Sequence, residues 1–130
     1  MLKKTITYID YNGNERTEDY YFNLTEVEAM ELELSASGGL TANIQKIVDS
    51  QDGAAIFRIF KEIILKAYGE KSLDGKRFIK SKELSEAFSQ TGAYNKFFME
   101  LVTDADAAAA FINGITPDEA KTELKKESGK

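Results

Sequence analysis

Two aspartates, Asp104 and Asp106, are the residues whose spacing comes closest to a catalytic site. They lie in TDADAAAAFING, residues 103–114, and many metal-dependent enzymes hold a divalent ion with such an Asp-x-Asp pair. Side chains two residues apart in a helix, however, point about 200° apart around its axis, so these carboxylates cannot share one ion. Thr103 or Asp104 instead suits the N-cap of a helix, and acids in a first turn interact favourably with the helix dipole. We therefore expect this pair to begin a helix and to bind no metal.

The composition removes most other routes to catalysis. The chain of 130 residues contains no histidine and no cysteine. Histidine is the commonest general base near neutral pH and the commonest neutral metal ligand. Thiolate metal sites and disulfides both need cysteine. Carboxylates, hydroxyls and amines remain, but no acid pair converges, so we predict a protein that is not an enzyme and that uses no cofactor and no metal.

The segment GEKSLDGKRFIK, residues 69–80, could suggest two further ligands. An EF-hand register would place Arg77 eighth and Ser81 twelfth, where a calcium loop needs an apolar residue and a glutamate. Its bases, with Phe78 as a stacking residue, could suggest nucleic acid, but the pI of the chain is near 4.9, whereas such domains are usually basic. We expect neither ligand, and interpret the segment as the one long loop, with an Asp-Gly turn before Phe78 and Ile79 return to the core.

Charge is distributed unevenly along the chain, whose formal net charge is −5. From Asp10 to Glu33 there are eight acids against Arg16 alone, and from Lys71 to Lys82 there are five bases against Asp74 alone. Opposite fields of this kind can steer partners, or copies of one chain, toward each other. They can also be two solvated surfaces. The pattern leaves both interpretations open, and with the hairpin below it suggests a homo-oligomer.

A β-hairpin is predicted over residues 3–24. KTITYID and TEDYYFNL are rich in β-branched and aromatic residues, and Asn12-Gly13 between them is a strong hairpin signal. Two strands alone are marginally stable in water. Tyr20, Phe22 and Leu24 share one face, so we expect them to pack on helices or to pair with another chain through an exposed edge.

Helices are predicted for most of the remaining chain. Thr25 and Glu28 form a capping box before an apolar stripe of Val27, Met30 and Leu34. A second helix should run from Thr41 to about Ser50. Asp52 should cap the longest helix, closed by Gly69, and Ser81 the next one. The apolar arc of the longest helix is formed by Ile56, Ile59, Phe60, Ile63, Ile64 and Ala67.

Three places in these helices are candidates for binding a partner. Leu65 lies among charged residues, opposite the arc, as a lone exposed leucine or as part of an interface. Met99 projects toward the polar side of the aromatic segment 93–102, where an adaptable thioether would suit partner contact. A thin face, which should let another helix approach closely and should exclude Ala107 and Ala110, is formed by Ala105, Ala108, Ala109 and Ile112.

These elements predict a small, compact multi-helix domain of the α+β class, mainly α with a short N-terminal β-hairpin. The domain should cover residues 1–115, with helices over 25–115. Residues 116–130 begin with a capping signal but contain few apolar residues, so we expect a weakly packed helix or tail. No window approaches the ~20 apolar residues of a membrane span. We expect no membrane contact and a cytoplasmic location.

Four segments resemble one protein family. They are YYFNLTEVEAMELELS, GGLTANIQKIVDSQDG, FKEIILKAYGEKSLDGKRFIKS and ELSEAFSQTGAYNKFFMELVTDADAAAAFINGI. Their order and wording, over about residues 3–115, are similar to the tail assembly chaperones of long-tailed phages and prophages of Gram-positive bacteria. The family has no catalytic residues to transfer to this sequence.

The resemblance implies a non-enzymatic protein of the host cytoplasm, outside the mature virion. It would bind the long tape measure protein, its client, and keep it soluble while tail tube subunits polymerise, with the major tail tube protein as a second potential partner. It also implies a longer product made by ribosomal frameshifting, which an amino-acid sequence cannot reveal. The alternative is a structural component of the tail or a head-to-tail connector, which would stay in purified particles.

Overall fold

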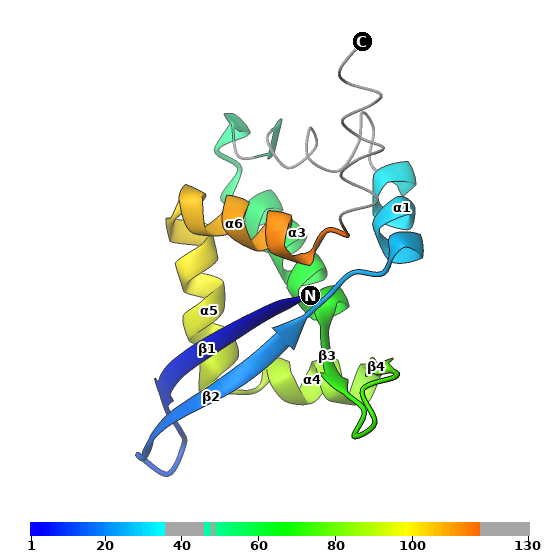
Figure 1. Ribbon diagram of the computed structural model, residues 1–130. Coiled ribbons are helices and arrows are strands. Elements are labelled where there is room, and N and C mark those ends of the chain that lie inside the picture. Colours follow the sequence, from blue (N-terminus) through cyan, green and yellow to red (C-terminus); the bar gives the residue numbers. More distant parts are fainter. Residues whose placement is uncertain (36–45, 48, 118–130) are drawn as a thin grey trace.

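The computed structural model describes residues 1–35, 46–47 and 49–117, and shows a mainly helical domain with an N-terminal antiparallel strand pair (Figure 1). The predicted α+β class is therefore confirmed. The hairpin consists of β1 (Leu2–Ile9) and β2 (Glu15–Phe22). It lies across the helices, and its loop end projects beyond them. The predicted helix from Thr41 and the predicted tail fall largely outside the described residues.

The hairpin loop is built around Asp10. The Asp10 carboxylate accepts hydrogen bonds from the backbone N–H groups of Asn12 and Asn14, both at 2.9 Å. Gly13 donates to the Asp10 carbonyl and adopts φ +82°, a left-handed conformation that glycine reaches without strain. The loop therefore has three residues between Asp10 and Asn14 and fixes a register in which Ile9 pairs with Glu15.

A second hairpin was not predicted. Strands β3 (Tyr68–Lys71) and β4 (Phe78–Ile79) extend the sheet in the order β1-β2-β3-β4. The prediction of a long loop over residues 69–80 was wrong at its two ends, because short strands flank the turn at Gly75. Gly69 lies within β3 and does not close the preceding helix; a Cβ there would stand 2.7 Å from the Ile79 carbonyl oxygen. This close pairing requires glycine.

Helix α1 (Glu26–Ser35) begins at the predicted capping box but buries a different face. The Thr25 hydroxyl accepts from the Glu28 N–H at 3.1 Å, and the Glu28 carboxylate accepts from the Thr25 N–H at 2.9 Å. Ala29 and Leu32 are buried, whereas Val27 is 66% and Met30 50% exposed. The predicted stripe of Val27 and Met30 therefore faces solvent, and its third member Leu34 has no described side chain.

Four further helices complete the described domain: α3 (Gly53–Ala67), α4 (Lys82–Ser89), α5 (Gly92–Thr103) and α6 (Ala105–Ile115). Asp52 and Ser81 cap α3 and α4 as predicted, with their side chains accepting from Ala55 and Leu84 N–H groups. Thr116, predicted to begin another helix, caps the end of α6 by donating to the Ile112 carbonyl at 2.6 Å.

Phe22 is the centre of an aromatic core. Its side chain is fully buried, and its ring centroid lies 5.2 Å from Phe97, 5.5 Å from Phe111 and 5.8 Å from Phe88. These three partners belong to α5, α6 and α4, so one residue of β2 joins the sheet to three helices. Phe60, Ile63, Ile64 and Ala67 of the predicted arc are buried around it, with Ile56 and Ile59 packed at its edge.

Candidate interaction surface

A largely apolar groove lies between α3 and α5 on the described surface. Its volume is about 670 Å³. The α3 wall is formed by Phe57, Arg58 and Lys61. The α5 wall and one end are formed by Ser89, Tyr94, Asn95, Phe98 and Met99. This eight-residue set is called the α3/α5 groove.

Two large apolar side chains in the groove are half exposed. Phe57 is 49% and Met99 50% exposed, whereas Phe98 and Tyr94 beneath them are 7% and 9% exposed. The Phe57 ring lies 5.1 Å from Phe98, and Phe98 lies 5.6 Å from Tyr94. Tyr94 and Phe98 therefore form a buried aromatic floor. Phe57 and Met99 offer apolar surface that a partner could cover.

The α3 wall of the groove is basic. Arg58 and Lys61 are both exposed, and neither forms a salt bridge with any residue that the structure describes. Asn95 is on the opposite wall. An occupant that carries acidic side chains beside apolar ones would therefore match both the chemistry and the charge of this groove.

Met99 is the predicted partner-binding residue that lies in this groove. Leu65 is instead partly buried against the core, and its carbonyl accepts a hydrogen bond from the Ser85 hydroxyl of α4 at 3.1 Å. Leu65 is thus not a lone exposed leucine, and it lies apart from Met99. Phe57 was missed by the sequence reasoning. Its one signal was an aromatic ring at the margin of the apolar arc, next to Arg58 in sequence.

The thin alanine face of α6 is divided between core and solvent. Ala105 and Ala109 are exposed, whereas Ala108 and Ile112 pack against the core. Ala107, which was predicted to lie outside the contact face, also packs against the core. The inward face of α6 contains Phe111 and Ile115, which are both buried. The run of alanines obscured this face in the sequence. These four predicted residues therefore do not form one free surface, although Ala105 and Ala109 remain accessible.

Asp104 is the N-cap of α6, as predicted. Its carboxylate accepts from the backbone N–H of Asp106 at 3.0 Å and of Ala107 at 3.2 Å. Asp106 lies in the first turn, where an acid complements the helix dipole. Over the described ranges, no group of three or more acidic, histidine or cysteine side chains could hold a metal ion. Asp104 therefore has a structural role in beginning α6.

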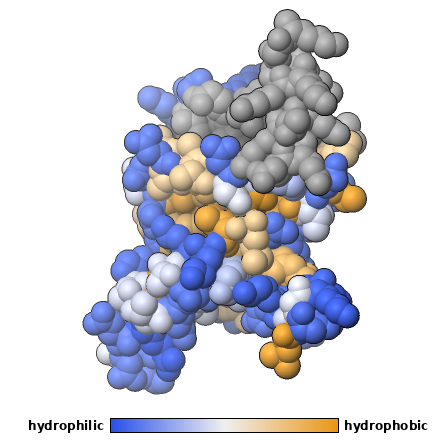
Figure 2. All heavy atoms as spheres, in the orientation of Figure 1, coloured by the Kyte–Doolittle hydropathy of each residue, from blue (hydrophilic) through white to orange (hydrophobic). Residues whose placement is uncertain are grey.

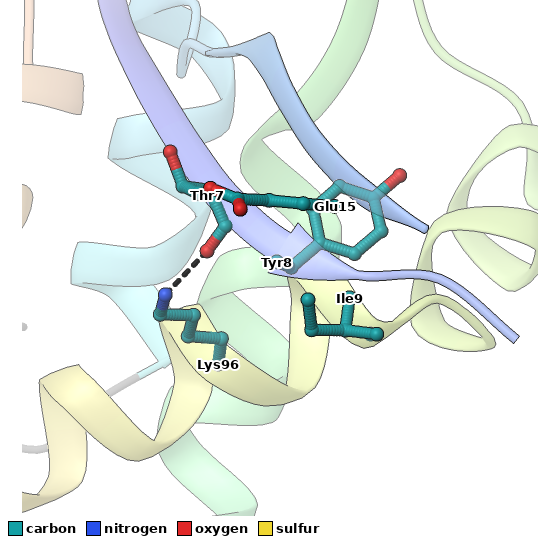
Figure 3. Close-up of a pocket in the computed structure, with 6 residues that line it drawn as sticks. Thr7, Tyr8, Ile9, Glu15 and Lys96 are labelled. Atoms are coloured by element: carbon teal, nitrogen blue, oxygen red, sulfur yellow. Dashed lines mark hydrogen bonds between the residues drawn. The ribbon is translucent and has the colours of Figure 1, made fainter. Parts of the chain in front are cut away.

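The two outer edges of the hairpin differ. Because Asp10 pairs with Asn14, the backbone groups of Lys3, Thr5, Thr7 and Ile9 point away from β2. The Lys96 ammonium of α5 donates to the Thr7 carbonyl on this side (Figure 3). Together with Tyr8, Ile9, Glu15 and Gly92, these residues line a small hollow. Helix α5 therefore covers part of the β1 edge.

Among the described residues, no strand pairs with the first half of the β2 edge. Strand β3 pairs with β2 only at Tyr21 and Phe22. By the same alternation, the backbone groups of Glu15, Thr17 and Asp19 point toward unpaired space. These side chains are exposed and mostly acidic, and Figure 2 shows the projecting hairpin end as hydrophilic. Charged edge strands resist pairing with other strands, so this edge is less suited to self-association than the sequence suggested.

A hydrogen-bond cluster lies toward the loop end of the hairpin, on the same face as the core residues Ile6 and Phe22. The Tyr8 hydroxyl donates to the Glu18 carboxylate, and the Tyr20 hydroxyl donates to the same oxygen at 2.9 Å. The bond from Tyr8, followed by that from Tyr20, lowers the pKa of Glu18 below its ordinary value. Burial, with its hydrogen bonds, raises the pKa of Tyr20. The cluster keeps Glu18 charged and both phenols protonated, which stabilises the strand pair.

The acidic and basic segments meet inside one chain. The Lys80 ammonium donates to the Glu28 carboxylate and to the Asn23 carbonyl, both at 2.6 Å. Burial raises the pKa of Glu28, but the bonds from Lys80 and Thr25 outweigh it and hold the pKa below its ordinary value. Lys66 lies 3.6 Å from Glu31. Part of the predicted opposite charge is therefore used to fix α1 on its own domain.

Comparison with known proteins identifies the family. The family model described as phage tail assembly chaperone matches residues 1–129, nearly the whole chain. A search of curated proteins and a search of solved structures each found no match. Among the described residues, no helix is long and apolar enough to cross a membrane. Because the family model spans almost every residue, the chain belongs to the phage tail assembly chaperone family.

Proposed function

We propose that this protein binds the tape measure protein of its phage and keeps it soluble while tail tube subunits polymerise around it. Membership of the chaperone family supports a role in tail assembly. The observation that carries the more specific proposal is the α3/α5 groove, where Phe57 and Met99 are each about half exposed over an aromatic floor.

The groove suits an apolar helix of the client. Helix recognition in a groove depends on side chains at intervals of three or four residues, and the walls of this groove are themselves two helices. Met99 can adapt to side chains of different shape because its thioether is flexible and polarisable. A groove of this kind can hold many similar helical segments, as a long client requires.

Several copies could bind along one client molecule. Each copy would use its own groove, and the many weak contacts along one chain would add to a high effective affinity. In this proposal the protein works in the host cytoplasm and is displaced as the major tail tube protein assembles, so it is not retained in the virion. The role is binding, and it assigns no catalytic residue.

Co-expression with the tape measure protein tests the proposal. We expect wild-type protein to keep the client in the soluble fraction and Met99→Glu to lose most of this effect, because a carboxylate replaces apolar surface worth about 1.5–3 kcal/mol when buried. Leu73→Glu is the matched control, since Leu73 is fully exposed in the turn between β3 and β4. Equal melting temperatures for the three proteins would show that folding is unaffected.

Two results would overturn the proposal. A client that stays soluble with Met99→Glu as well as with wild type would remove the groove from client binding. The chain's presence at fixed copy number in purified virions would favour a structural tail component or head-to-tail connector. Analysis of purified particles by mass spectrometry provides the second readout.

A further inference from the structure

Helix α1 presents a second half-exposed apolar surface, on a different part of the fold. Val27 and Met30 are 66% and 50% exposed, although both lie in a helix whose other face is buried through Ala29 and Leu32. In Figure 1, α1 and α5 stand on opposite sides of α3. The chain therefore displays an apolar helix face in one place and an apolar groove in another.

The outward face of α1 has acids on both sides of its apolar residues. Successive residues are about 100° apart around a helix, so Glu26, Met30, Val27 and Glu31 follow one another around one arc. Glu26 is exposed, and the Glu31 side chain is 62% exposed although Lys66 lies 3.6 Å away. The face is thus an apolar pair flanked by negative charge.

This face is complementary to the α3/α5 groove. The groove offers Phe57 and Met99 as apolar surface, with Arg58 and Lys61 along one wall. Apolar contact between the two surfaces would cover four half-exposed side chains. The acids of α1 would then stand near bases that have no ion pair among the described residues. Both contributions favour the same docking.

Helix α1 of the same chain cannot occupy the α3/α5 groove unless it first detaches from its own domain. Glu28 is held by Lys80 at 2.6 Å and Glu31 by Lys66 at 3.6 Å, while Ala29 and Leu32 are buried in the domain. These contacts fix α1 with Val27 and Met30 pointing outward. Its exposed face can therefore be covered by another molecule.

We infer that α1 of a second copy occupies the α3/α5 groove of this protein when the tape measure protein is absent. The contact is heterologous, because a helix of one copy meets a groove of the next, so copies add into open chains or close into rings. The proposed function assigns the client to the same groove, and one consequence of the inference rests on that function. Self-association and client binding exclude each other at each groove, so client binding would release α1.

Three single substitutions with the same charge change test the contact. Met30→Glu disables α1, Met99→Glu disables the groove, and Leu73→Glu alters neither. Sedimentation velocity at low salt should show that wild type and Leu73→Glu associate equally. Met30→Glu and Met99→Glu should each raise the dissociation constant about tenfold or more, because each places a charge in a contact that buries a side chain. Raising the salt concentration should weaken the wild-type association.

A mixture of the two disabled proteins provides the decisive readout. Met30→Glu retains an intact groove and Met99→Glu an intact α1, so an equimolar mixture should form a heterodimer and stop there. No restored association in the mixture, unchanged association of Met30→Glu, or a wild-type monomer at high concentration and low salt would each overturn the inference.

Failure of the inference can be separated from failure of the proposed function. Met30→Glu leaves the groove intact and should still keep the tape measure protein soluble. If it associates like wild type while Met99→Glu loses the client, the self-contact is wrong and the function stands. If the mixture forms heterodimers while Met99→Glu still protects the client, the self-contact stands and the groove is not the client site.

Discussion

The open edge of β2 and the α3/α5 groove both expose groups that a partner could cover, but the side chains around them have opposite character. Within the described part of the chain, the edge leaves backbone groups of Glu15, Thr17 and Asp19 unpaired but surrounds them with exposed, mostly acidic side chains. The groove leaves Phe57 and Met99 half exposed, with two bases beside them. Charge on an edge strand prevents aggregation. Apolar surface in a concave groove promotes contact. The difference favours our proposal of partner binding through side chains of helices over addition of a strand.

The largest expected effect is a difference in the free energy of unfolding between substitutions on the floor of the groove and on its rim. Phe98→Ala should lower the free energy of unfolding by about 3–5 kcal/mol, because Phe98 is 7% exposed and its loss leaves a cavity. Phe57→Ala should cost only about 1 kcal/mol, because it removes one ring contact at the half-exposed rim. Urea denaturation measures both. If Phe57→Ala proves as costly as Phe98→Ala, Phe57 belongs to the core and the groove loses its exposed aromatic.

A smaller effect tests whether an exposed residue of α6 is also part of a binding surface. Ala108→Arg should cost about 1–3 kcal/mol by overpacking, because Ala108 packs on the core. Ala109→Arg, one residue further, should change stability by less than about 0.5 kcal/mol, because Ala109 is exposed. Thermal melts should show this contrast. In co-expression, Ala109→Arg should still protect the tape measure protein; loss of protection at a normal melting temperature would move the client site to α6.

The smallest expected effect concerns the hairpin and its pH dependence. The pKa of Glu18 is lowered by hydrogen bonds from Tyr8 and Tyr20, so its stabilising contribution is complete above its ordinary pKa of about 4.3 and is lost as pH falls through the lower folded value. Glu18→Gln should remove this loss and cost at most about 1 kcal/mol at neutral pH, because solvent screens the cluster.

Denaturation midpoints between pH 3 and pH 7 measure the Glu18 effect. The acid loss should be flatter in Glu18→Gln but not abolished, because Asp10, whose pKa is lowered by Arg16, keeps its own dependence. Client protection at neutral pH should be unchanged, in contrast to Met99→Glu. An acid profile identical to that of wild type would show that the cluster does not stabilise the hairpin.

The fold was predictable wherever local chemistry determined it. The sequence correctly predicted the hairpin turn at Asn12-Gly13 and the capping box of Thr25 and Glu28. It also correctly predicted three helix caps, Asp52, Ser81 and Asp104. The β3–β4 hairpin was missed because Tyr68–Lys71 is only four residues long and continues directly from α3. Its strand conformation depends on pairing with β2, which is distant in sequence.

The candidate site was predictable only in part, for a related reason. Met99 was identified because it lies on the polar side of an otherwise apolar helix. Phe57 was not, because it belongs to the margin of an apolar arc and its exposure depends on where α5 packs against α3. Similarly, Val27 and Met30 were grouped into one apolar stripe because their spacing is helical, although Ala29 and Leu32 form the inward face of α1. Periodicity alone cannot choose between two apolar faces of one helix.

Methionine methyl NMR tests the central claim most directly, because the chain contains only three methionines. Met99 reports on the α3/α5 groove, Met30 on α1, and Met1, which is 61% exposed, on the start of the hairpin. Spectra of the dilute free protein should be compared with those of the complex purified after co-expression with the tape measure protein. We expect the Met99 signal to shift and broaden on complex formation while the Met1 signal stays in place. An unchanged Met99 signal in a stable complex would contradict client binding in the groove.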